Sequence, residues 1–163
     1  MKKIAILLFL LAGCRDSEEQ VNQAAPAGEP GTPPSAALAT LTGLYEGGTA
    51  QRPNQLCITK GEGGAERFGL VVWGANDHSC SGSGTVSRRG DRLQLAMAGD
   101  SSCMIEAPIS GANLTLPGTL PKGCAYYCGA RASLAGASFT QKGTTEADAL
   151  KAKDLVGDPL CGG

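Results

Sequence analysis

Residues 91–116, "DRLQLAMAGDSSCMIEAPISGANLTL", alternate apolar and polar side chains over three consecutive short runs. In the first run, Leu93, Leu95 and Met97 fall on one face, with polar or small residues between them. The later runs repeat the pattern with Cys103, Ile105, Ala107, Ile109, Leu114 and Leu116. A period of two is that of a half-buried strand. The stretch therefore predicts an antiparallel sheet with one face turned to a core.

Further short apolar runs extend this pattern to both sides. The additional predicted strands are 41–47, 56–60, 68–74 and 132–139. Glycine-rich turns at 61–65 and 89–91 separate neighbouring runs. About eight short strands in consecutive antiparallel order predict a mostly β fold, either a small antiparallel barrel or a sandwich.

One short C-terminal helix is predicted after the last strand. Thr145 can cap its first turn, with Asp148 three residues on. Gly157 and Pro159 are expected to end it.

The chain has 24 glycines, 9 prolines and only 4% aromatic residues, which favours turns and short strands over long helices. Residues 38–163 are expected to form a single domain, long enough for a core of its own. Without residues 1–13 the chain keeps 12 basic and 15 acidic residues, a net charge of −3. That balance argues against nucleic acid as a partner.

The N-terminus has the pattern of an export signal. Met1-Lys2-Lys3 is basic, and Ile4 to Leu11 is apolar but too short to span a bilayer. Leu11-Ala12-Gly13-Cys14 resembles the lipobox of bacterial lipoproteins. The resemblance implies that residues 1–13 are a signal peptide that is removed, and that Cys14 is acylated.

The residues after Cys14 bear on where the protein is retained. In bacterial lipoproteins an Asp directly after the cysteine favours the inner membrane, and here that position is Arg15. The resemblance thus implies a lipid anchor in the bacterial outer membrane, with the domain facing the periplasm or exposed at the surface. Residues 14–37, which include "AAPAGEPGTPPSAA", have no apolar period and are expected to be a disordered tether.

Six cysteines follow the signal region, and an even number in an exported domain predicts three disulfides. They are Cys57, Cys80, Cys103, Cys124, Cys128 and Cys161. Sequence alone allows fifteen connectivities. Position in the predicted sheet favours Cys103 with Cys124, Cys128 with Cys161, and Cys57 with Cys80.

Two stretches carry other candidate chemistry. In "GCAYYCG", 123–129, Cys124 and Cys128 could bind copper or zinc as thiolates, with His78 as a third ligand. In "ANDHSCSGSG", 75–84, Asp77, His78 and Ser79 are adjacent and cannot converge as a catalytic triad. The second stretch is predicted to be a polar surface turn. For the protein as a whole, no cofactor and no enzymatic activity are expected.

The sequence therefore favours a non-catalytic lipoprotein that binds or stabilises an envelope protein. Metal handling through Cys124, Cys128 and His78 is one alternative. Another is inhibition of a lysozyme-type enzyme, because membrane-bound inhibitors of C-type lysozyme are similar in being small lipoproteins with an antiparallel barrel and disulfides. Their Ser-Gly-x-x-Tyr loop is matched here only by Ser81-Gly82, with Thr85 in place of the tyrosine. The domain also resembles small uncharacterised proteobacterial lipoproteins with a Cys-x-x-x-Cys-Gly motif, here Cys124 to Gly129.

Overall fold

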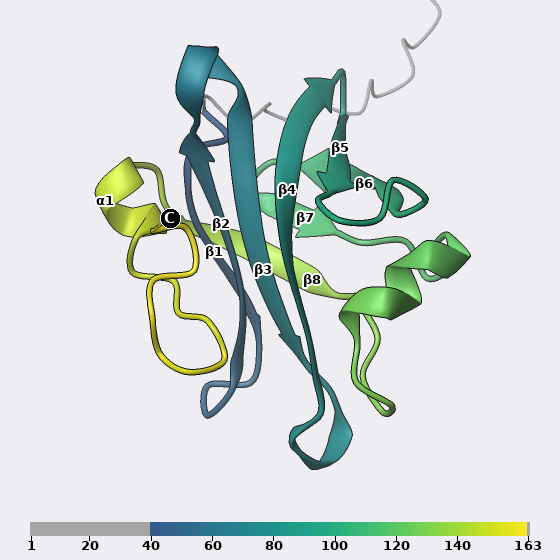
Figure 1. Cartoon of the computed structure of the whole chain (residues 1–163). Coiled ribbons are helices and arrows are strands. Elements are labelled where there is room, and N and C mark those ends of the chain that lie inside the picture. Colours follow the sequence, from purple (N-terminus) through teal and green to yellow (C-terminus); the bar gives the residue numbers. More distant parts are fainter. Residues whose placement is uncertain (1–39, 163) are drawn as a thin grey trace, which may run out of the picture. The chain divides into compact units, whose positions relative to one another are not determined.

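The computed structural model describes residues 40–162 (Figure 1). The predicted signal peptide, Cys14 and the predicted tether over 14–37 lie outside the described residues. Each strand pairs antiparallel with the next along the chain, and the last strand pairs back with the first. The strands are β1 (Gly43–Gly48), β2 (Pro53–Lys60), β3 (Glu66–Trp73), β4 (Ser79–Arg89), β5 (Arg92–Met97), β6 (Met104–Ser110), β7 (Asn113–Thr115) and β8 (Ser138–Gly143). The mostly β prediction is confirmed, and the closure of the sheet makes it a barrel, not a sandwich.

The up-and-down order gives the barrel two ends with different loops. The chain enters at Thr40, and the β2–β3, β4–β5 and β6–β7 turns lie at this same end, here called the proximal end. The β1–β2 and β3–β4 connections lie at the opposite, distal end, toward the bottom of Figure 1. Loops separated in sequence are thereby brought together at each end.

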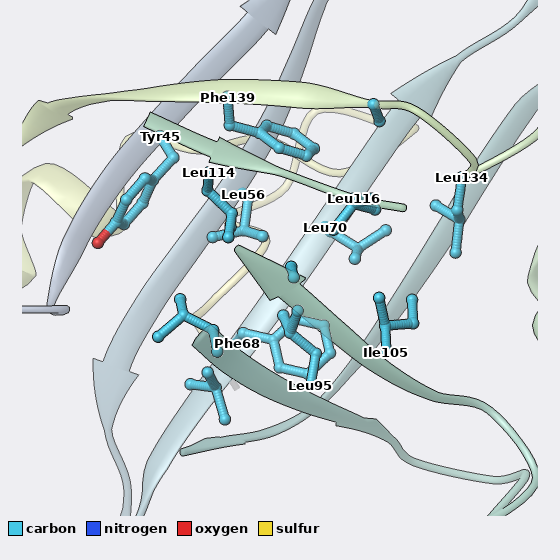
Figure 2. Packing of buried hydrophobic residues seen from close by; sticks show 14 of the residues in the cluster. Tyr45, Leu56, Phe68, Leu70, Leu95, Ile105, Leu114, Leu116, Leu134 and Phe139 are labelled. Atoms are coloured by element: carbon cyan, nitrogen blue, oxygen red, sulfur yellow. The ribbon is translucent and has the colours of Figure 1, made fainter. Parts of the chain in front are cut away.

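Large apolar side chains from every strand meet inside the barrel and fill it (Figure 2). The largest with less than 2% exposure are Tyr45, Phe68, Phe139, Leu56, Ile58, Leu70, Leu93, Leu95, Ile105, Leu114, Leu116 and Leu134. Those within strands stand at alternate positions, as the period of two predicts, while Leu116 and Leu134 lie just outside the strands. Each contributes about 1.5–3 kcal/mol relative to an exposed side chain. Because the interior is filled with side chains, any ligand has to bind on the outer surface or at the loops.

The longest strand, β4, occupies residues predicted to be a polar turn, and that prediction is wrong for 79–84. Its outward side chains are serines, a threonine and, at the end, Arg89, while two of its inward positions are Gly82 and Gly84, so the strand shows no apolar alternation. The glycines are required by close packing. A Cβ on Gly82 would lie 2.9 Å from the Tyr127 ring, and one on Gly84 would collide with the backbone of Ala96.

The last strand begins later than the sequence indicates, because β8 covers 138–143 and the predicted strand was 132–139. The apolar residues that suggested a strand are buried from a loop instead. Leu134 is 1% exposed and Ala137 is 8% exposed, although both precede β8. Apolar residues in the sequence indicated burial here, but they did not distinguish a strand from a buried loop.

Three disulfides join the domain, and one predicted pair, Cys103–Cys124, is confirmed. The other two predicted pairs are wrong, because Cys57 bonds to Cys161 and Cys80 bonds to Cys128. Cys57 could not have met Cys80, since Cys80 belongs to the interior core and Cys57 to a separate cluster on the outside of the sheet. The three bonds close 21, 48 and 104 residues. In the chain-entropy model each stabilises by about 3–5 kcal/mol.

The cluster outside the sheet is built by the C-terminal residues. Leu44 and Cys57 on the barrel pack against Ala149 and Ala152, with Leu160 and Cys161 partly covering them. The chain after the barrel therefore folds back over β1 and β2, and the Cys57–Cys161 bond holds it there.

The predicted helix is present as α1 (Glu146–Ala149), and its predicted cap is confirmed. Thr145 and Asp148 form a reciprocal capping box. The helix ends eight residues before Gly157, because the chain must turn at Leu150 to bury Ala152 against Cys57. No helix among residues 40–162 is long and apolar enough to cross a membrane.

The Asp148 carboxylate should make stability depend on pH at the acid end. Hydrogen bonds from Lys151 (2.6 Å) and Thr145 (2.7 Å) lower the pKa of Asp148 to about 2. An unfolded Asp has a pKa of about 3.9. Because the folded pKa is the lower one, the stabilisation is fully present above about pH 4 and is lost as pH falls towards 2. Asp148→Asn should lower the melting temperature at pH 7, and the gap from the wild type should close near pH 2.

Asp158→Asn is the matched control, because the Asp158 side chain makes no hydrogen bond within the described residues. It should leave the pH dependence unchanged. A gap between Asp148→Asn and the wild type that persists undiminished at pH 2 would contradict this account of the cap.

Candidate functional site

The distal end gathers the residue types that most often carry binding energy in protein interfaces. We define the distal surface as Arg52, Trp73, Asn76 and Asp77. Arg52 ends the β1–β2 connection, Trp73 ends β3, and the other two belong to the short turn η2 (Ala75–Asp77) before β4. Trp73 is the only tryptophan of the chain, and it is half-buried where the two connections meet.

Arg52 links the two connections through a cation–π contact and an ion pair. Its guanidinium carbon lies 5.3 Å from the centroid of the Trp73 ring. Its Nη1 also forms an ion pair with the Asp77 carboxylate, although both side chains are largely exposed, at 46% and 71%. An exposed ion pair and a cation–π contact each contribute at most about 1 kcal/mol. The arrangement therefore orients the side chains more than it stabilises the fold.

The turn that carries Asp77 is held in an uncommon backbone conformation. Asn76 and Asp77 have φ angles of 52° and 63°, the two positive values outside glycine among the described residues. The left-handed region costs about 1–2 kcal/mol per residue, with Asn and Asp tolerating it best. Hydrogen bonds from Gly74 N to His78 O (2.8 Å) and from His78 N to Ala75 O (3.2 Å) close the turn.

A third segment, 128–132, packs against this turn. The Cys80–Cys128 disulfide fixes its start, and Gly129 N donates to Ser79 O at 2.8 Å. The backbone of Arg131 and Ala132 lies so close to Gly74 that a Cβ there would be 2.6–2.7 Å from it. Residue 74 must therefore be glycine. The distal surface is thus presented by a rigid frame, which lowers the entropy lost on binding.

The β3 end is also fixed by the neighbouring strand. Trp73 N donates to the side-chain oxygen of Asn54 at 2.8 Å, which ties the start of β2 to the end of β3. An amphipathic ring, a guanidinium, a carboxylate and an amide are consequently held side by side on two connected loops. Such a set can recognise a partner through stacking and hydrogen bonds.

The predicted metal ligands are not brought together as thiolates. Cys124 bonds to Cys103 and Cys128 bonds to Cys80, so the two sulfurs belong to different disulfides. His78 lies beside Gly129, with its Nδ1 3.3 Å from where a Cβ on that glycine would be. Within residues 40–162 no group of three or more His, Cys, Asp or Glu side chains could hold a metal ion. Metal binding by these residues would require two disulfides to be reduced.

The turn η3 (Lys122–Tyr127), which contains Cys124, is fixed to the β5–β6 connection. The Tyr127 hydroxyl donates to Ala98 O at 2.7 Å and accepts from Asp100 N at 2.9 Å. Its neighbour Tyr126 projects outward and is 77% exposed. A hollow of about 410 Å³ between η3 and the following loop includes Cys124 and Cys128 in its lining.

Ser81 and Gly82, the partial match to a lysozyme-inhibitor loop, lie inside β4. Gly82 faces the Tyr127 ring, so this pair does not protrude from the barrel.

Sequence reasoning singled out Asp77 but missed Arg52 and Trp73. Trp73 ends an apolar run that predicts only a strand, and Arg52 lies in a connection with no periodic signal. The available hint was a lone tryptophan at a strand end, followed by Gly74 and two residues that tolerate positive φ.

No protein-family model matches the chain, and comparison with curated proteins and with solved structures gives no significant match.

The contact between Arg52 and Trp73 can be tested by fluorescence, because the chain has one tryptophan. Arg52→Ala should increase quenching of Trp73 by acrylamide, since the guanidinium no longer covers the ring. The free energy of unfolding should change by less than about 1 kcal/mol. Arg131→Ala, an exposed arginine at the same end, is the control and should leave quenching unchanged. Equal quenching in Arg52→Ala and the wild type would contradict the described geometry.

Proposed function

We propose that this protein is a lipoprotein of the bacterial outer membrane, anchored through Cys14, whose barrel is a non-catalytic module that binds another envelope protein. The N-terminal resemblance to a lipobox supports the anchor. The three disulfides support an oxidising compartment such as the periplasm. The filled interior favours a surface contact over an enclosed ligand.

The observation that carries the binding role is the distal surface. Trp73 and Arg52 are of the types enriched in interface hot spots, and the frame around them is rigid. The backbone strain at Asn76 and Asp77 is kept although it contributes nothing to the core. The distal surface lies opposite Thr40, where the chain from the anchor enters, so a bound partner would not compete with that connection.

The experiment uses the full chain in cells, with a photo-crosslinking residue in place of Thr49 beside the distal surface. Thr49 is exposed, and within residues 40–162 its side chain accepts one hydrogen bond, from Arg52 N at 3.2 Å. We expect a crosslink to one envelope protein that is lost in Trp73→Ala. It should persist in Tyr126→Ala, which removes an exposed aromatic side chain elsewhere. In the same preparation, mass spectrometry should find Cys14 acylated at the N-terminus of the mature protein.

The two readouts fail independently. An unmodified Cys14, or a mature N-terminus elsewhere, would contradict the lipoprotein assignment. An acylated Cys14 without any crosslink that depends on Trp73 would contradict the binding role of the distal surface.

A further inference from the structure

The proximal end of the barrel carries an excess of positive charge that the net charge conceals. Its turns and strand ends hold six basic residues, Lys60, Arg67, Arg88, Arg89, Arg92 and Lys142. They hold three acidic residues, Glu62, Glu66 and Asp91, and the Glu146 carboxylate at the start of α1 lies against them, accepting a hydrogen bond from Lys60 N at 3.1 Å. Over residues 40–162 as a whole, 11 basic and 11 acidic residues balance. The folding of the chain, not its composition, thus concentrates cations at one end.

Two of these cations face each other across a strand pair. Arg89 on β4 is the direct partner of Arg92 on β5, on either side of the tight turn at Gly90 and Asp91. Both side chains are exposed. Like charges directly opposite one another destabilise a sheet. Neither arginine has an ion pair in the part of the chain that the structure describes, although Asp91 lies in the turn between them.

The other exposed cations of this end are equally unpaired. Arg67, Lys60 and Lys142 also form no ion pair within residues 40–162. Arg67 on β3 pairs with Thr85, which lies four residues before Arg89 on β4. Arg67 and Arg89 therefore project from the same outer face of the sheet. The result is a group of exposed guanidinium and ammonium donors that form no ion pair within residues 40–162. Donors of this kind recognise phosphate.

This end is also the one to which the anchor is connected. Thr40 lies at the proximal end, and 25 residues join it to Cys14. Even a fully extended chain of that length spans no more than about 90 Å. An acylated Cys14 would therefore keep the proximal end at high effective concentration near lipid headgroups.

We infer that the proximal end, with Arg89 and Arg92 at its centre, docks on the phosphate groups of anionic lipids in the membrane that holds the anchor. This inference rests on the proposed function only for the presence of the anchor. Docking in this way would turn the distal surface away from the membrane and towards a partner.

The test uses residues 15–163, purified with disulfides intact, so that acylation plays no part. This protein keeps the core clusters, the three disulfides and both loop ends of the described residues, which all lie within 40–161. Vesicles of phosphatidylcholine alone, or with 30% phosphatidylglycerol, are floated with the protein. We expect binding to the anionic vesicles alone, weakening as salt is raised.

Arg89→Glu with Arg92→Glu should weaken binding to anionic vesicles by about tenfold or more. Lys122→Glu with Arg131→Glu is the matched control, because it changes net charge equally through two exposed residues away from the proximal end. It should bind within about twofold of the unaltered protein. Melting temperatures of both variants check that the barrel is intact.

Two outcomes would overturn the inference. One is equal loss of binding in the control variant, since net charge and not the proximal end would then be responsible. The other is absence of binding by the unaltered protein. This includes the case in which binding appears only after Asp16, Glu18, Glu19 and Glu29 are replaced by the neutral amides Asn and Gln. In that case the chain's own acidic residues occupy the proximal end. Neither outcome bears on whether Cys14 is acylated.

Discussion

Pairing of β1 with β8 is the contact on which the rest of the structure depends, because it converts a row of hairpins into a closed barrel. Tyr45 is central to this closure. Its ring is fully buried, and its hydroxyl donates to Leu41 O at 2.7 Å and accepts from Gln141 Nε2 at 3.2 Å. Gln141 also reaches the backbone oxygens of Thr40 and Thr42. The first and last strands are thus joined by packing and by side-chain hydrogen bonds, and burial raises the pKa of the Tyr45 phenol.

Closure leaves two ends and an outer surface for function, since the interior is filled. The two ends differ in character. The distal end presents an aromatic ring and an ion pair on a strained, braced turn, whereas the proximal end presents Arg67, Arg89 and Arg92, which form no ion pair within residues 40–162. A disulfide braces the distal end through Cys80 and Cys128. Neither surface is needed to close the barrel, which is why both support an interpretation in terms of binding.

The alternation over 91–116 was enough to predict antiparallel strands, and Thr145 with Asp148 was enough to predict the helix cap. The sequence could not reveal β4, because glycines at inward positions remove the apolar signal. It could not pair Cys57 with Cys161 either, because that bond depends on which side of the sheet Cys57 faces. The distal surface depends on loops that meet only once the barrel is closed. Arg52 and Asp77 are 25 residues apart in the chain, and no local pattern connects them.

The disulfide map of the protein purified without reductant tests the folded arrangement most directly. Proteolysis under non-reducing conditions should yield three linked pairs, Cys57–Cys161, Cys80–Cys128 and Cys103–Cys124, and no cysteine among these six open to alkylation. The first pair requires the C-terminal residues to lie on the outer face of β2, and the second requires the segment after η3 to lie against β4. A Cys57–Cys80 or Cys128–Cys161 link would contradict this barrel. Free thiols confined to Cys124 and Cys128 would contradict it too, and would favour metal binding instead.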